Sequence, residues 1–406
     1  MTATRRPAPP ASDSRAVPAA LLISAILLLA LNLRGPLVAV SAVVDPIRTD
    51  LGIDAATVGL FTSLPVLCFG LATPLASALL ARAGLGRGVL LALAVLLVGI
   101  VVRSLDGLPA AIIGTLLLGL AITAANVAVP VVIGRDLPRQ AGAVLGAYTA
   151  ALNVGTMLTL SLTVPIAAAT GWRTALASWG ALVVVAAIVW WRAVRHPAAG
   201  PAPIGDAPVT GPATWWRRPV VWVLTAAFAG QAFAYYGVTA WLPQLLRDEL
   251  GMAPAAAGAA AAVFQVAALV GAFGVPALLR YTSALTTVLV VCATWTTIPL
   301  GLLLAPSAWA VWCIIGGFAQ GGGLVVIFSL AVRAARDTAE NRRFSALVQG
   351  GGYTVAAAAP PVLGAVHAAT GDWTAPLLVV LAAIALLALT GSAAARTQAT
   401  SRRAPG

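Results

Sequence analysis

Arg34 is the residue of this sequence whose type and position point most clearly to chemistry. It lies in the segment NLRGP (32–36), near the middle of an apolar run over about 17–44. A run of this length predicts a transmembrane helix, which needs about 20 apolar residues. An arginine near the bilayer centre costs about 2.5–3.5 kcal/mol on insertion scales, so it usually faces a protein cavity and marks a functional site.

The guanidinium of Arg34 indicates which solutes such a cavity would bind. Its planar fork pairs bidentately with carboxylate-like anions, so small anionic solutes, or neutral polar solutes with acceptor atoms, fit best. The structural alternative is that Arg34 holds helices together through backbone carbonyls or Asn side chains. The two hypotheses differ in whether the partner of the guanidinium is a solute or a group of the protein itself.

The positions of the acidic residues favour a solute as the partner of Arg34. All 12 Asp and Glu residues fall in loops or at expected helix ends, and none remains for the membrane midplane. Among 24 basic and 12 acidic residues, Arg34 is the only one expected near the midplane. Because a buried carboxylate is the usual proton carrier and the usual counter-charge for a cationic drug, an antiporter of polycationic drugs fits poorly.

Other polar side chains inside apolar runs are candidates to line the same cavity. Asn126 and Asn153 can hydrogen-bond a solute or, equally, join helices. Asn32 lies two residues from Arg34, on a different helix face, and can instead orient a helix contact. Gln320 stands between two glycine clusters, which favour close helix packing.

Two further pairs have helical spacing. Gln231 and Tyr235 are four residues apart and share a helix face, which predicts a partner surface for Arg34 from the second half of the chain. Gln349 and Tyr353 have the same spacing. The candidate substrate-binding residues are Arg34, Asn32, Asn126, Asn153, Tyr148, Gln231, Tyr235, Gln320, Gln349 and Tyr353.

The remaining reactive residue types predict little chemistry. His367 lies near the outer end of an apolar span and is a candidate for proton coupling, the alternative being an ordinary helix-end histidine. Cys68, Cys292 and Cys313 fall inside apolar spans, so they are expected to be small buried hydrophobes. We expect no metal site, no cofactor and no enzyme activity, because no acid, base or ligand constellation is present.

The composition defines the elements that must position Arg34. Sixty per cent of the 406 residues are hydrophobic and only 9% are charged, against about 25% in average proteins. The apolar residues form long blocks, which predicts an all-α integral membrane protein. The net charge of +12 then consists of topological arginines, and no nucleic acid is expected as a partner.

Charges and Pro/Gly clusters divide the chain into twelve expected spans. Their cores are 18–44, 56–81, 88–104, 108–133, 141–168, 172–194, 219–246, 255–279, 283–305, 307–332, 343–369 and 373–395. With the N-terminus inside, 19 arginines fall on the cytoplasmic side and 4 outside, so both termini are expected in the cytoplasm. The first run is too long for a secretory signal and is expected to remain uncleaved.

The expected organisation is two six-helix halves joined by a linker. It comprises a cytoplasmic tail (1–17), an N-terminal half (18–195), a Pro/Gly/Ala-rich cytoplasmic linker (196–218), a C-terminal half (219–395) and a second cytoplasmic tail (396–406).

An internal repeat supports this division. The segment IRTDLGI (47–53) matches LRDELGM (246–252), TGW (170–172) matches TGDW (370–373), and RD (135–136) matches RD (336–337), all at an offset near 200. Three matches at nearly one offset and at equivalent points of the topology indicate duplication. Two six-helix halves of the same orientation, related by an axis along the membrane normal, are the layout of the major facilitator superfamily.

Several segments resemble one branch of that superfamily, the cyanate and 2-nitroimidazole transporter family. They are NLR (32–34) followed by DPIR (45–48), LPVLCFG (64–70), GRDLP (134–138), YTAALN (148–153), QGGGY (349–353) and WTAP (373–376). There are two departures. The loop 80–87 lacks the acidic residue that the superfamily often has there, and Pro36 stands one position later than is usual.

The resemblance implies secondary active transport by alternating access, with the first, fourth, seventh and tenth spans lining the cavity. We therefore expect a monomeric transporter of the bacterial-type inner membrane. Its solute would be small and anionic or polar, such as a cyanate-like anion, with Arg34 as central ligand and a proton as the candidate coupling ion. The alternatives are efflux of neutral drug-like compounds such as nitroimidazoles, and a non-transporting membrane receptor.

Overall fold

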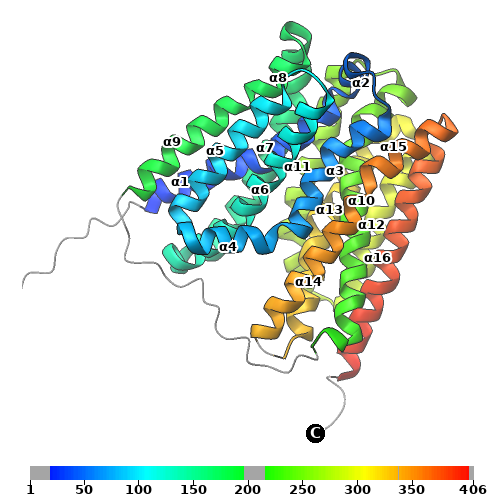
Figure 1. Cartoon of the computed structure of the whole chain (residues 1–406). Coiled ribbons are helices and arrows are strands. Elements are labelled where there is room, and N and C mark those ends of the chain that lie inside the picture. The colour runs from blue at the N-terminus through cyan, green and yellow to red at the C-terminus, as the bar shows by residue number, and fades with distance from the viewer. Residues whose placement is uncertain (1–18, 196–214, 337, 402–406) are drawn as a thin grey trace, which may run out of the picture.

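The structure is a computed structural model that describes residues 19–195, 215–336 and 338–401, and these residues form helices and short connections without strands (Figure 1). The expected tail 1–17, most of the linker and the end of the second tail lie outside the described residues. The α-helices are α1 (Ala19–Val38), α2 (Val44–Leu51), α3 (Ala55–Leu71), α4 (Thr73–Ala83), α5 (Leu85–Arg103), α6 (Leu108–Asp136), α7 (Ala141–Thr170), α8 (Trp172–Ser178), α9 (Gly180–Val194), α10 (Pro219–Leu250), α11 (Pro254–Tyr281), α12 (Ala284–Leu304), α13 (Trp309–Ala334), α14 (Thr338–Ala356), α15 (Ala359–Thr370) and α16 (Thr374–Ser401).

Each expected span corresponds to one or two of these helices. Within the described ranges, ten helical segments are long and apolar enough to cross a membrane, or eleven when the bent pair α2–α3 counts as one. Three spans are divided: the second into α3 and α4, the sixth into α8 and α9, and the eleventh into α14 and α15. Figure 1 shows that α4 runs across the direction of α3. The first span ends in a short 3₁₀ helix, η1 (Ala39–Ala42).

The helix contacts repeat between the two halves. Helix α1 packs on α7 and α9, and α10, its counterpart, packs on α14 and α16. The halves meet where α7 contacts α11 and where α3 contacts α14 and α15. These two contacts join the fifth span to the eighth and the second to the eleventh, so each becomes the other when the spans are shifted by six. The arrangement is the twofold one that the sequence repeat predicts.

Glycines allow the halves to approach closely. A Cβ atom at Gly59 of α3 would lie 2.8 Å from the backbone of Pro360 and Pro361, and one at Gly258 of α11 would lie 2.6 Å from the carbonyl oxygen of Leu160. Small residues that admit a neighbouring backbone are typical of helix interfaces in membranes. These contacts therefore fix the helix spacing at the interface between the halves.

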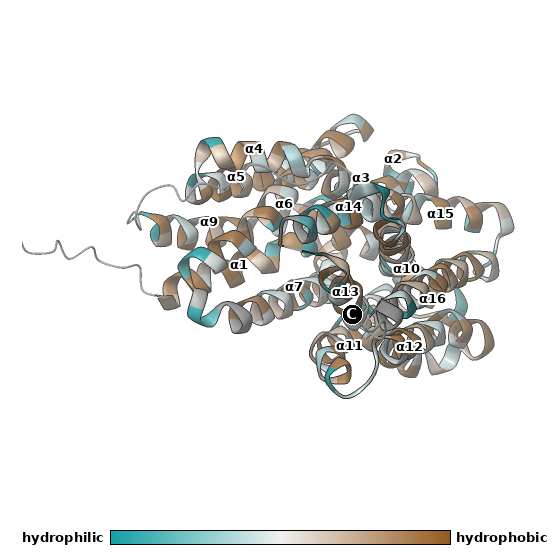
Figure 2. Ribbon diagram, turned by 90° about the horizontal axis from the view of Figure 1, so that it is seen from below, coloured by the Kyte–Doolittle hydropathy of each residue, from teal (hydrophilic) through white to brown (hydrophobic). Residues whose placement is uncertain are grey.

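The two large clusters of buried apolar residues follow this layout. One is built mainly from the helices of the second half together with η1, α2 and α3, and the other from α1, α5, α6, α7 and α9. Figure 2 shows hydrophobic residues along most of the bundle. The free cysteines Cys68, Cys292 and Cys313 are buried in the bundle, so the expectation of small buried hydrophobes is confirmed.

Candidate functional site

Arg34 lies on α1 where the two halves meet. Its Nη1 donates to Oδ1 of Asn153 on α7 at 3.5 Å and to the hydroxyl of Tyr235 on α10 at 3.4 Å. The guanidinium carbon also lies 5.4 Å from the centre of the Tyr235 ring, in the range of a cation–π contact. One side chain therefore contacts an element of each half.

Close packing of α1 on α7 places Arg34 beside Asn153. Gly155 of α7 faces the backbone of Leu31, and a Cβ atom there would collide with it. Gly35 faces Thr159, again without room for a side chain. Because these glycines lie next to the two polar residues, the approach of the helices brings the amide within reach of the guanidinium.

Part of the guanidinium remains available for a ligand. Both of its hydrogen bonds use Nη1, so Nε and Nη2 keep three N–H donors without a partner among the described residues. No Asp or Glu of the described chain pairs with Arg34. Four tyrosines lie near the arginine instead: Tyr148, Tyr235, Tyr236 and Tyr353.

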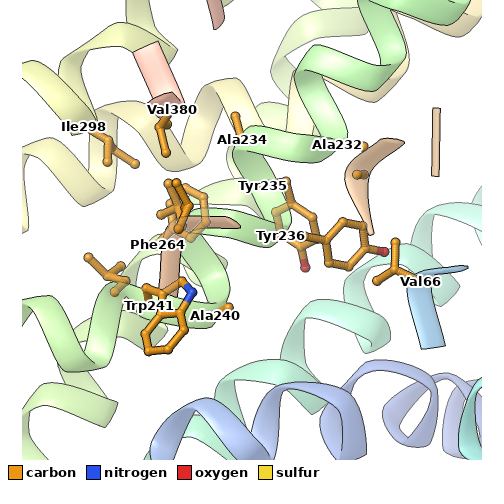
Figure 3. Packing of buried hydrophobic residues seen from close by; sticks show 14 of the residues in the cluster. Val66, Ala232, Ala234, Tyr235, Tyr236, Ala240, Trp241, Phe264, Ile298 and Val380 are labelled. Carbon is orange, nitrogen blue, oxygen red and sulfur yellow. The ribbon is translucent and has the colours of Figure 1, made fainter. Parts of the chain in front are cut away.

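The tyrosines come from three helices. Tyr148 of α7 donates to Oδ1 of Asn126 on α6 at 2.9 Å. Tyr235 and Tyr236 of α10 lie with ring centres 4.8 Å apart, and Tyr236 lies 6.3 Å from Tyr353 of α14. Figure 3 shows Tyr235 and Tyr236 side by side on α10.

A continuous row of aromatic rings leads away from Arg34. Tyr353 contacts Phe228 of α10 with ring centres 5.0 Å apart, and Phe228 contacts Phe328 of α13 at 5.9 Å. Phe69 of α3 covers Tyr353 from the other half at 5.6 Å. We call Tyr235, Tyr236, Tyr353, Phe228 and Phe328 the aromatic row. Such rings offer flat apolar surface with hydroxyl groups at its edge.

A cavity of about 500 Å³, wide open to its surroundings, lies at the far end of the aromatic row. It is lined by one face of α13: Leu324, Val325, Phe328, Ser329, Val332 and Arg333. Phe328 belongs to both the row and the cavity wall, so the row connects the cavity to Arg34. Viewed from below, α13 lies near the middle of the bundle beside α10 and α14 (Figure 2).

Three of the predicted polar residues are engaged elsewhere. Asn32 donates to the carbonyl oxygens of Leu28 at 2.7 Å and of Leu182 on α9 at 3.4 Å, so it joins α1 to α9. Gln231 accepts from the indole N–H of Trp295 at 2.7 Å and donates to the backbone carbonyl of Gln320 at 3.3 Å. The structure therefore brings Gln231 and Gln320 together inside the second half and not at Arg34.

Two further candidates lie on α14 and α15. Gln349 is half-buried on α14, one turn before Tyr353. His367 of α15 stacks on Trp373 with ring centres 4.1 Å apart, and its Nε2 lies 3.9 Å from a carboxylate oxygen of Asp248. Its partly exposed ring belongs to this separate cluster and not to the group around Arg34.

Arg34 is not the only arginine whose side chain lies inside the protein. Arg103, assigned from the sequence to an outer segment, is only 1% exposed and donates from Nη1 to the carbonyl oxygen of Pro36 at 2.6 Å. It lies at the end of the expected span 88–104, where its side chain was expected on the outer side of the membrane. Its side chain instead turns back into the protein.

The sequence does not single out Phe228 and Phe328, because a phenylalanine in an apolar span has no polar atom to distinguish it from core. Phe69 stood out only as part of the segment LPVLCFG (64–70). Tyr236 did have a signal in the sequence. The chain has only 5 tyrosines, and two in succession on one helix are a signal that the i,i+4 spacing rule passes over.

Fold and site together define a polytopic membrane transporter: two sets of helices meet, and a polar group around Arg34 lies between them. The chain belongs to the Major Facilitator Superfamily, whose family model matches residues 20–335. The superfamily assignment and the all-α membrane fold class are thereby confirmed, with ten or eleven of the twelve expected spans long and apolar enough to cross a membrane within the described residues, and the protein is a transporter and not an enzyme.

Three relatives show which members of the superfamily the chain resembles. The chain is 30% identical to the uncharacterized transporter YycB of Bacillus subtilis (strain 168), over 92% of this chain and 93% of that one. It is 29% identical to the 2-nitroimidazole transporter of Escherichia coli (strain K12), covering 92% and 95%. It is 26% identical to the cyanate transport protein CynX of the same organism, covering 87% and 91%. The resemblance to the cyanate and 2-nitroimidazole transporters is thus confirmed.

Solved structures agree on the fold. A bacterial homologue of the human lysosomal transporter Spinster, in an inward-facing and unoccupied conformation, superimposes with a TM-score of 0.74 at 16% identity, covering 98% of this chain and all of that one. A point mutant of the nucleoside transporter NupG gives 0.74 at 12% identity, covering 92% and 99%. At these identities the match concerns the fold alone.

Proposed function

We propose that this protein moves a small anionic or polar solute by alternating access, with Arg34 as the central ligand. The observation that carries the proposal is the state of the guanidinium. It retains free N–H donors, it lies between the halves, and no carboxylate of the described chain neutralises it. A solute with acceptor oxygen or nitrogen atoms supplies the missing partner.

The other groups around Arg34 support distinct roles in this proposal. Asn153 and Tyr235 orient the guanidinium from the two sides, and Tyr353 offers a hydroxyl and a ring face to the solute. Tyr148 and Asn126 form a second polar pair close by. The contacts of Asn32, Gln231 and Gln320 support a role in helix packing instead. Those of His367 support a role in proton coupling, at a place away from the solute.

The distribution of the arginines supports an orientation for the chain. We propose that it lies in a bacterial-type inner membrane with both termini in the cytoplasm. The end of the molecule where α2, α8 and α15 lie, which we call the α2 end (top of Figure 1), then faces outward. Residues 18–195 and 219–395 are the moving halves, and the cavity beside Arg333 opens to the cytoplasm.

A neutral nitroaromatic compound is the second candidate solute. The aromatic row favours it, because flat rings stack well on aromatic side chains. A nitro group also presents two acceptor oxygens that fit the guanidinium. The relative named for 2-nitroimidazole and the relative named for cyanate keep both candidates open.

Transport by the purified protein in proteoliposomes tests the proposal. The probes are labelled cyanate and 2-nitroimidazole, measured by flux and by the shift of the melting temperature on binding. Arg34→Ala is expected to remove both signals while the protein still folds, and Arg34→Lys is expected to lose most of them, because the ammonium cannot form a bidentate pair.

The control is Arg48→Ala, which removes the same charge from an exposed position on α2. Flux of either probe at the wild-type rate in Arg34→Ala would overturn the central role of the arginine. A melting shift without flux in the wild type would favour the receptor hypothesis over transport.

A further inference from the structure

Arg103 is a buried cation that the proposed transport site does not include. It is the last residue of α5, and Nη1 forms its one hydrogen bond within the described chain, to the carbonyl oxygen of Pro36. Nε and Nη2 are buried without a partner among the described residues. The contact spans 67 positions of sequence, so it links α5 to α1 and is not a local helix cap.

Burial of this charge is hard to explain by stability alone. A buried ion without a paired ion loses its hydration and regains only part of it through hydrogen bonds, so an apolar residue of similar volume is often as good or better for stability. Arg103 leaves two of its nitrogen atoms buried without a partner among the described residues. The presence of Arg103 at this buried position is therefore better explained by a role other than packing.

The acceptor of Arg103 lies in the weakest part of α1. Pro36 has no backbone N–H, so the helix loses a hydrogen bond one turn before it, at Asn32. Gly35 adds backbone freedom at the preceding position. Beyond Val38 the helix tightens into the 3₁₀ turn η1. Arg34 thus stands on a stretch of helix whose own hydrogen bonds hold it poorly.

Close packing of α5 on α6 holds the main chain of Arg103 in place. A Cβ atom at Gly114 of α6 would collide with the backbone of Arg103, so the two helices are in direct contact there. A Cβ atom at Gly99, one turn earlier on α5, would lie 2.9 Å from the carbonyl oxygen of Gly114. The guanidinium therefore reaches Pro36 from a rigid pair of helices, and a charge-assisted hydrogen bond of 2.6 Å is a strong one.

We propose that Arg103 is the positioning residue of the site: its hydrogen bond to Pro36 fixes the segment 34–42 and so the direction in which Arg34 points. This inference rests on the proposed function, since it assumes that Arg34 binds the solute. Arg103 does not touch the solute. It sets where the guanidinium that does so is held.

The test compares Arg103→Met, Arg103→Lys and the control Arg48→Met in the purified full-length protein. Arg103→Met removes the donor and fills a similar volume. Hydrogen exchange of peptides covering 36–43 is expected to be about fivefold or more faster in this variant, because the segment loses its external hydrogen bond. Binding of cyanate or 2-nitroimidazole, measured by the melting shift, is expected to weaken about tenfold or more.

Two readouts separate positioning from ordinary structural support. The melting temperature of unliganded Arg103→Met is expected to equal or exceed that of the wild type, whereas a structural role predicts a fall. Arg103→Lys, which can still donate to Pro36, is expected to recover slow exchange and most of the affinity. Arg48→Met should behave as the wild type in every assay.

The inference would be overturned if Arg103→Met exchanged over 36–43 at the wild-type rate or bound the probes with wild-type affinity. It would also be overturned if the loss of affinity followed a fall in melting temperature and Arg103→Lys did not restore it. If Arg103→Met fails to fold, Arg103→Lys alone decides, because loss of affinity with slow exchange contradicts positioning. Failure of the proposed function is a different result: Arg34→Ala would then bind both probes normally, whatever the exchange data at Arg103 show.

Discussion

The ion pair between Asp45 of α2 and Arg247 of α10 is predicted to help hold the α2 end of the molecule closed. Oδ2 of Asp45 lies 2.6 Å from Nη1 of Arg247, and the side chains are 34% and 28% exposed. Because α2 and α10 belong to different halves, the pair must separate when the halves move apart at this end. Asp45→Asn removes the charge and keeps the shape.

The expected magnitude follows from exposure. Partly exposed ion pairs contribute about 0.2–1 kcal/mol, so the population open at the α2 end should rise about 1.4-fold to fivefold in Asp45→Asn. High salt should produce part of the same rise in the wild type, because salt screens exposed charges.

Labelling of an engineered cysteine measures this population. Ser41 is 4% exposed and lines a small cavity at the α2 end together with Trp241 and Gly59. Ser41→Cys should therefore react with a maleimide mainly when that end opens. The natural cysteines are buried, which keeps the background low.

The labelling rate in detergent is expected to rise by the stated factor in Asp45→Asn and to return toward the original rate in the charge-swapped variant Asp45→Arg/Arg247→Asp. An unchanged rate at low salt, or a swapped variant that labels as fast as Asp45→Asn, would refute the argument that this pair holds the two halves together.

Two other predictions concern packing and the ion pair at the N-terminal end of α10. Gly155→Ala places a methyl group against the backbone of Leu31 and should lower stability by about 1–3 kcal/mol, seen as a lower melting temperature. Gly134→Ala, with open space around it, should not. Burial would raise the pKa of Glu340, but hydrogen bonds from Arg218 and a backbone N–H outweigh this and hold it below the usual value. Its contribution to stability is thus present near neutral pH and lost as pH falls through that lowered pKa, so the melting temperature of Glu340→Gln should fall less than that of the wild type on acidification below about pH 4.5.

The features most accessible from the sequence were those that a single residue or a regular spacing encodes. The long apolar blocks defined the spans, and the repeat at an offset near 200 defined their pairing. Arg34 stood out because a charge in an apolar run is unusual by itself. Its contacts with Asn153 and Tyr235 involve two of the residues selected as candidates, because polar groups in membrane helices have few places to go except toward one another.

Features that depend on the packing of distant segments were not accessible. Arg103 and Pro36 lie 67 residues apart, and only the close contact of α5 and α6 turns the arginine inward. Gln231 does lie four residues from Tyr235, but the indole N–H of Trp295 requires an acceptor and takes its amide oxygen. Spacing along one helix predicts which residues share a face. It does not predict which neighbouring helix that face meets.

The geometry of Arg34 suggests how solute binding is coupled to movement of the halves in the proposed cycle. Its hydrogen bonds to Asn153 and Tyr235 are 3.5 and 3.4 Å long, which is weak for a charged donor. A bound anion at the usual 2.7–2.9 Å would pair with the guanidinium far more strongly than either side chain does. Tyr235 belongs to the opposite half, so a solute held between it and Arg34 lowers the free energy of the state in which the halves close around the site. A ligand shifts a conformational equilibrium only by its difference in affinity for the two states, and this contact across the halves is where such a difference arises.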